Sequence, residues 1–148
     1  MNMLPKKSFF SKTQESEIIQ AIKTAELNTS GEIKVHVEST VGKEDTFERA
    51  LEVFAKLEMH KTKLRNGVLF YLATQDRKFA IVGDQGINQM VKEGFWDEIK
   101  KVMDTHFAQK EFTLGLSKGI LMAGEQLKAH FPYQSDDKNE ISDEISEA

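Results

Sequence analysis

Three segments of the chain show the hydrophobic patterns of β-strands. Residues 32–38 read Glu-Ile-Lys-Val-His-Val-Glu. This alternation, with β-branched residues at the apolar positions, predicts a strand with one buried face. Residues 68–73 are apolar throughout, which is typical of a central strand covered on both faces. Residues 78–82 follow a turn-like segment directly, so we expect them to pair antiparallel with 68–73 in a hairpin.

Four other segments repeat apolar residues at helical spacing. They cover approximately residues 11–27, 45–59, 96–107 and 116–127. The first opens on a capping-box pattern, Ser11 followed by Gln14, and the second on Asp45 followed by Glu48. We also expect a short helical turn between the third strand and the third helix. Strands and helices thus mix along one chain, which predicts an α/β fold.

The length and composition indicate a single domain followed by a tail. The chain has 148 residues, within the range of roughly 100–200 residues for one domain. We assign residues 1–133 to that domain. Residues 134–148 are polar and acidic with two isolated isoleucines, so we expect a disordered tail.

Charge and hydropathy exclude several classes of partner. The formal net charge is −4, and most of the acidic excess lies in the tail. A body without a basic stripe has no means of holding a phosphate backbone, so we expect no nucleic acid. No apolar run reaches the roughly 18–20 residues that span a bilayer, so we expect no membrane segment. The absence of cysteine and of a signal peptide pattern favours a cytoplasmic location.

The predicted strand order brings distant residues to one edge of the sheet. A strand, a helix and a second strand in succession form a βαβ unit with parallel strands. Glu32 and Asn66, at the starts of these strands, therefore lie at the same end. The hairpin then reverses the chain and returns Asp84 to this end, beside Arg65.

Oxygen-bearing side chains collect at this edge and in the loop beyond it. Carboxylate and amide oxygens from several loops are the ligands that Ca²⁺ and Mg²⁺ require. The candidate metal ligands are Glu32, Asn66, Asp84, Glu93, Asp97 and Glu98. A structural alternative stays open, in which Asp84 caps a turn and Asp97 lies at a helix start. Glu32 then pairs with Arg65.

Five short motifs, in this order and spacing, resemble the TPM domain family. Residues 29–33 read Thr-Ser-Gly-Glu-Ile, 66–69 Asn-Gly-Val-Leu, 76–78 Asp-Arg-Lys, 83–87 Gly-Asp-Gln-Gly-Ile and 111–116 Glu-Phe-Thr-Leu-Gly-Leu. The resemblance spans about residues 9–127. The chain looks like a stand-alone bacterial TPM domain, without the export signal or membrane tether of many relatives.

The resemblance implies both a fold and a site. It implies a three-layer αβα sandwich, with a small mixed sheet of three or four strands flanked by about four helices. Some members bind calcium, and one is credited with acid phosphatase activity. This chain has Arg65 where the family often has an acidic residue, which removes a carboxylate from the implied site.

The motifs of common enzymes do not occur in the sequence. The four histidines form no His-Glu-x-x-His pattern, which argues against a zinc site. Esterase, P-loop and dinucleotide-binding motifs are also missing. For His36, His60, His106 and His130 we expect roles at the surface or at helix ends.

These observations favour a divalent-cation-binding module that is non-catalytic or regulatory, with Ca²⁺ or Mg²⁺ as its cofactor. A first alternative is a weak metal-dependent acid phosphatase, in which Asp84 activates water and Arg65 stabilises the leaving charge. A second is a scaffold that binds a protein partner of unknown identity.

Overall fold

The computed structural model describes residues 9–133 and 141–148. Its helices are α1 (Lys12–Glu26), α2 (Thr46–Lys56), the 3-10 turn η1 (Met59–Lys61), α3 (Gln85–Asn88), α4 (Phe95–Ala108) and α5 (Phe112–His130). Its strands are β1 (Glu32–Glu38), β2 (Gly67–Ala73), β3 (Lys78–Gly83) and β4 (Ser146–Glu147). The helices and strands predicted before residue 134 are thus confirmed, with small shifts at their ends.

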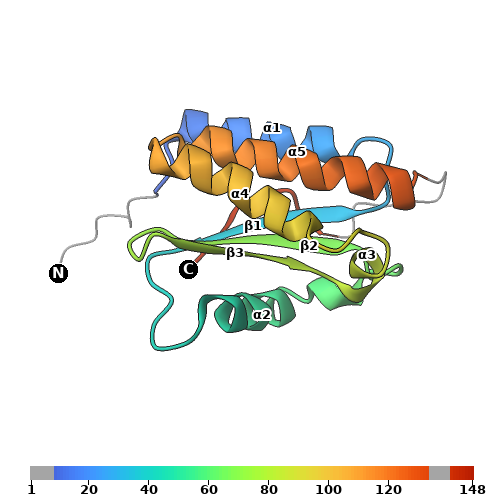
Figure 1. Cartoon of the computed structure of the whole chain (residues 1–148), viewed down its shortest axis with the longest axis horizontal. Coiled ribbons are helices and arrows are strands. Elements are labelled where there is room, and N and C mark those ends of the chain that lie inside the picture. Colours follow the sequence, from blue (N-terminus) through green and yellow to red (C-terminus); the bar gives the residue numbers. More distant parts are fainter. Residues whose placement is uncertain (1–8, 134–140) are drawn as a thin grey trace.

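The four strands form one open mixed sheet in the order β3-β2-β1-β4. β1 runs parallel to β2 and to β4, and β2 runs antiparallel to β3. Helices α1, α4 and α5 cover one face of the sheet, and α2 covers the other (Figure 1). The expected α/β fold with a small mixed sheet between helical layers is confirmed.

Helices α1 and α2 begin where the sequence supplies a capping side chain. The predicted capping box is formed, since Gln14 N donates to Ser11 Oγ and Ser11 N donates to Gln14 Oε1. Asp45 caps α2 by accepting from the main chain of Phe47 and Glu48. These caps satisfy N–H groups that have no partner within the helix. Local sequence therefore fixes where α1 and α2 begin.

Two hydrophobic clusters lie on the two faces of the sheet. Ile33, Val35 and Val37 of β1 belong to the cluster under α1, α4 and α5. The cluster on the α2 face contains Leu69 and Tyr71 of β2. Since β2 contributes to both clusters and is buried along its length, it is the central strand that its sequence predicted.

The polar side of β1 differs from the sequence prediction. All seven residues of the strand are buried, although one face was expected to be wet. His36 is only 5% exposed and stacks on Tyr71, so the expected surface role of His36 is wrong. Arg49 of α2 and residues from the end of the chain contact this polar row and take the place of solvent. Burial of both faces therefore comes from tertiary contacts.

The end of the chain also differs from the expected disordered tail. Residues 134–140 lie outside the described residues. Residues 141–148, which we term the C-terminal segment, run beside β1 and include β4. Ile141 packs against the cluster on the α2 face, and Ile145 packs against the opposite cluster. The two isoleucines thus attach an otherwise polar segment to the domain.

No helix in the described ranges is long and apolar enough to cross a membrane.

Candidate metal-binding site

The convergence predicted at one end of the sheet is present. Glu32 N lies 3.4 Å from Asn66 O, to which it donates. Asp84 N donates to Gly67 O across 2.9 Å, and Gly67 is the register partner of Glu32. Arg65 Nε and Nη2 donate to the Asp84 carboxylate at 2.7 and 2.8 Å. Parallel pairing of β1 with β2, followed by the hairpin, brings these groups together.

Asp84 takes the structural role that the sequence left open. Its carboxylate caps α3 by accepting from Gln85 N at 2.8 Å, in addition to the two contacts from Arg65. Gly86 is needed in this turn, because a Cβ at that position would lie 2.2 Å from Leu64 O. The carboxylate of Asp84 is thus already held by an arginine and by a helix cap. A metal-binding role for Asp84 stays a prediction.

The three acidic residues predicted beyond the sheet lie just before α4 or in its first turn. Glu93 is exposed and precedes α4, and Asp97 and Glu98 are exposed in its first turn. Carboxylates in a first helical turn favour the helix through its dipole. None of the three belongs to a group of clustered acidic or histidine side chains within the described residues. Their metal-binding role also stays a prediction.

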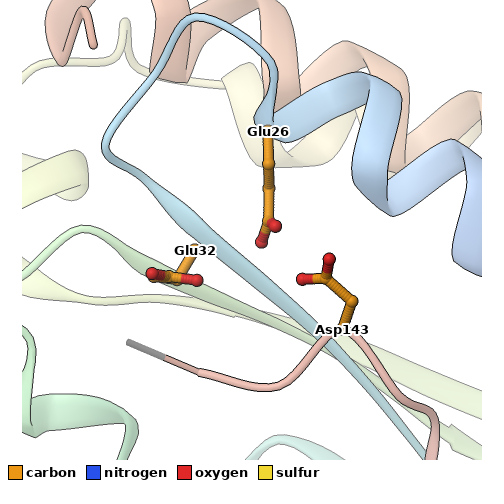
Figure 2. Close-up of side chains that lie close together, drawn as sticks. All are labelled: Glu26, Glu32 and Asp143. Atoms are coloured by element: carbon orange, nitrogen blue, oxygen red, sulfur yellow. The ribbon is translucent and has the colours of Figure 1, made fainter. Parts of the chain in front are cut away.

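Three other carboxylates do meet. Oxygens of Glu26, Glu32 and Asp143 all lie within 4.8 Å of one another. Figure 2 shows the three side chains converging from the end of α1, the start of β1 and the C-terminal segment. Glu32 is thus the one predicted ligand that the structure brings into such a cluster.

Local hydrogen bonds hold Glu26 and Glu32 in their relative positions. Ile33 N donates to Glu26 Oε2 at 2.7 Å, which ties the end of α1 to β1. In the turn between them, Thr29 Oγ1 donates to Leu127 O at 2.9 Å and accepts from Gly31 N at 3.1 Å. The turn is therefore anchored to α5, and Glu26 and Glu32 hold their relative positions.

The cluster strongly perturbs the protonation of Glu26. Burial, a hydrogen bond with Asp143 and the nearby charge of Glu32 raise the pKa of Glu26 to about 10, against the smaller opposing effect of the Ile33 N–H. A carboxyl group with this pKa carries a proton at neutral pH. The protonated Glu26 carboxyl group can therefore donate its hydrogen to Asp143.

Sequence reasoning missed Glu26 and Asp143 for different reasons. Glu26 lies only six positions before Glu32, so the short turn between α1 and β1 was a usable signal. Asp143 lies in a segment expected to be disordered. The spacing of Ile141 and Ile145 around it was the only pattern that pointed to an attached segment.

The donor set has the chemistry of a hard-cation site. Ca²⁺ and Mg²⁺ take oxygen ligands, chiefly carboxylates and amide carbonyls, and both are excluded from sites of soft ligands. A further candidate oxygen belongs to the side chain of Asn66, which immediately precedes β2 and is 1% exposed. Its Oδ1 has no hydrogen-bond partner in the part of the chain that the structure describes. The main-chain oxygen of the same residue accepts from Glu32 N, so Asn66 is a neighbour of the carboxylate cluster and a further candidate ligand.

Comparison with known proteins identifies the family. A family model described as the TPM domain matches residues 5–126. The chain belongs to the TPM domain family. The expectation drawn from the five sequence motifs is therefore confirmed.

Solved structures similar to this TPM domain come from three bacteria. The BA42 protein from the psychrophile Bizionia argentinensis is 44% identical, with a TM-score of 0.88 over 96% of this chain and 97% of that one. The N-terminal domain of a P. gingivalis protein is 20% identical, with a TM-score of 0.71 over 86% of this chain and 83% of that one. The N-terminal domain of the cg2496 protein from Corynebacterium glutamicum is 12% identical, with a TM-score of 0.66 over 90% of each chain. The last two show a shared fold alone.

The search among curated proteins found no match to this TPM domain.

Proposed function

We propose that this TPM domain binds a divalent cation, Ca²⁺ or Mg²⁺, as a non-catalytic or regulatory module. The observation that supports the proposal is the meeting of Glu26, Glu32 and Asp143, whose oxygens lie within 4.8 Å of one another. Three carboxylates at this separation repel one another unless a proton or a cation lies between them. A divalent cation neutralises two of the charges and takes oxygen ligands from all three residues.

Of the ligands predicted from the sequence, Asn66 is the second, after Glu32, that we assign to the proposed cation site. Its buried amide oxygen offers the kind of neutral ligand that completes Ca²⁺ coordination alongside carboxylates. Glu32 and Asn66 are therefore the predicted ligands that we keep. Glu26 and Asp143 replace the Asp84 carboxylate, which Arg65 already neutralises.

The test is calorimetric titration of the full chain with calcium, magnesium and manganese. We expect saturable heat for the wild-type chain and its loss in Asp143→Asn. Glu144→Gln is the matched control, since Glu144 is the exposed neighbour of Asp143 and lies outside the cluster. A cation at 100 times its dissociation constant should also raise the free energy of unfolding by about 2.7 kcal/mol.

Two results would contradict this assignment. The absence of saturable heat with every cation would remove the proposed function. Heat that persists in Asp143→Asn but disappears in a folded Asp84→Asn variant would move the cation to the loops around α3. Amide spectra of each variant establish that it is folded before its titration is interpreted.

A second candidate function is hydrolysis of phosphate esters, because the family model that matches residues 5–126 is named TPM phosphatase. The cationic group expected to assist this reaction is Arg65, and two of its nitrogens already donate to Asp84. An assay with a generic phosphate ester separates the two functions. Turnover that survives repurification and disappears in Asp143→Asn would support an enzyme. Turnover unaffected by that change would indicate a contaminant.

A further inference from the structure

A cavity of about 310 Å³ lies between β1, the turn after α2 and the C-terminal segment. β1 contributes Lys34 to its wall, the turn contributes Leu57, Lys61 and Thr62, and the C-terminal segment contributes Ile141 and Ser142. The volume falls at the lower end of the range of roughly 300–1,000 Å³ for ligand sites. None of the three clustered carboxylates lines this cavity, so it is distinct from the proposed cation site.

Lys34 places a buried positive charge in the wall of this cavity. The residue is 8% exposed, and its Nζ donates to the main-chain oxygens of Ser142 and Glu144 at 3.3 and 2.5 Å. Among the residues that the structure describes, no carboxylate forms an ion pair with Lys34. Burial lowers the pKa of Lys34, against the smaller opposing effects of Glu144 and Asp143. Since an ammonium group carries three hydrogens, one donor remains for a ligand.

Two hydroxyl groups of the wall can also donate into the cavity. Thr62 Oγ1 accepts from Asn66 N at 3.3 Å, and Ser142 Oγ accepts from Glu144 N at 3.1 Å. Within the described parts of the chain, neither hydroxyl donates to another group. A hydroxyl group has one hydrogen in addition to its acceptor lone pairs, so each of the two can donate to a ligand.

The acidic residue of the wall, Glu58, is paired with Lys61. Lys61 Nζ lies 3.1 Å from Glu58 Oε1, so these two charges offset each other and Lys34 sets the charge of the lining. The donors of Lys34, Thr62 and Ser142 complement a ligand group that only accepts hydrogen bonds. An ionised carboxylate is such a group, and hydrogen bonds from an ammonium group to it are stronger than those between neutral groups.

Leu57 and Ile141 supply the apolar part of the wall. Both are partly buried and pack against the cluster on the α2 face. Their side chains can remove a short aliphatic chain from water, which favours binding. The lining therefore suits a ligand with a carboxylate at one end and an aliphatic chain at the other.

We infer that this cavity is a binding site for a small organic anion, a monocarboxylate with a short aliphatic chain. The carboxylate accepts from Lys34, Thr62 and Ser142, and the chain packs on Leu57 and Ile141. This inference goes beyond cation binding and does not depend on it.

The test is an NMR titration of the full chain with hexanoate and, separately, with hexanamide, which has the same chain but no charge. With hexanoate we expect saturable shifts of the amide signals of Lys34, Thr62 and Ser142. With hexanamide we expect none at the same concentrations, because the charged acceptor is missing. Both titrations use the wild-type chain, so they decide the question even if a variant fails to fold.

Lys34→Met should weaken hexanoate binding roughly tenfold or more, because it removes a hydrogen bond between charged groups. Lys56→Met is the matched control, since it removes the same charge from an exposed position at the end of α2, outside the cavity. We expect the control to bind like the wild type. Equal weakening by the two substitutions would overturn the inference and indicate an effect of net charge.

Titrations in chelator and in excess calcium separate this inference from the proposed function. Saturable hexanoate shifts at the three cavity residues in either condition support the anion site, whatever calorimetry shows for the cation. Their absence in both conditions would overturn it, as would equal shifts with hexanamide. Shifts confined to residues outside the cavity would also overturn it.

Discussion

Glu38 shows how a single buried charge is accommodated in this domain. Its side chain is 7% exposed at the end of β1. Arg49 donates to both of its oxygens at 2.9 Å, and Tyr71 Oη donates to Oε2. Burial alone would raise the pKa of Glu38, but these hydrogen bonds outweigh burial and lower it to about 2. The carboxylate is thus stabilised as a charged group.

Replacement of this carboxylate should change both the stability and its pH dependence. Because the pKa is lower in the folded chain, the stabilisation is present above about pH 4.5 and is lost as the pH falls toward about 2. We expect Glu38→Gln to lower the free energy of unfolding by roughly 1.5–3 kcal/mol at neutral pH. The loss should shrink across that acidic window, as measured by urea unfolding at several pH values.

Glu52→Gln is the matched control for this prediction. Glu52 also accepts from Arg49, at 3.1 Å, but its side chain is 53% exposed. Surface ion pairs contribute little, so the control should retain the stability of the wild type. Equal losses in both variants would contradict the role given to burial.

At the scale of elements, the contact between α1 and α5 depends on a glycine. A Cβ at Gly124 would lie 2.6 Å from the Cβ of Ala25 and 2.8 Å from its Cα. Since part of this obstacle is backbone, the helices must separate to admit a side chain. Their close approach also holds Glu26, the residue after Ala25, against the sheet.

Alanine at this position should destabilise the domain although alanine favours helices. The helix gains about 1 kcal/mol from the substitution. Overpacking costs roughly 1–3 kcal/mol, and a rigid backbone obstacle places Gly124→Ala at the upper end. We therefore expect a net loss, measured as a lower midpoint in urea unfolding.

Gly119→Ala on the same helix provides the comparison. Its Cβ would meet the Sδ of Met103 at 2.8 Å, and this flexible side chain can move aside. We expect stability close to that of the wild type. A larger loss for Gly119→Ala than for Gly124→Ala would contradict the distinction between side-chain and backbone obstacles.

At the scale of the whole molecule, the carboxylate cluster joins three distant parts of the chain. Glu26 ends α1, Glu32 begins β1, and Asp143 belongs to the C-terminal segment (Figure 2). The pKa of Glu26 is raised to about 10, chiefly by burial and then by Asp143. An acid with a raised pKa stabilises the fold below its ordinary pKa of 4.5, and this stabilisation is lost as the pH rises toward about 10.

Glu26→Gln should therefore stabilise the cation-free domain at alkaline pH. Glutamine mimics the protonated acid and cannot lose a proton, so the decline in stability between about pH 4.5 and about 10 should become shallower. Thermal unfolding in chelator across this range measures the effect. The same variant should lose the stabilisation by calcium. A decline as steep as in the wild type would show that the carboxyl group of Glu26 does not titrate in this window.

The sequence by itself determined most of the fold. Periodic patterns and caps such as Ser11 and Asp45 fixed the strands and the start of the helices, because they act over a few neighbouring residues. The βαβ unit followed by a hairpin also predicted that Glu32, Asn66 and Asp84 would meet at one edge. These features depend on local sequence and on the short connections between elements.

Only the tertiary structure decided which carboxylates gather and what covers the outer edge of β1. The sequence placed Arg65 beside Asp84 but left open a pairing of Arg65 with Glu32, whereas in the structure Arg65 pairs with the Asp84 carboxylate. The C-terminal segment lacks a strong pattern of its own, and its place depends on contacts with Lys34 and with both core clusters. Such contacts join residues more than a hundred positions apart, and their energy exists only when the sheet is already formed.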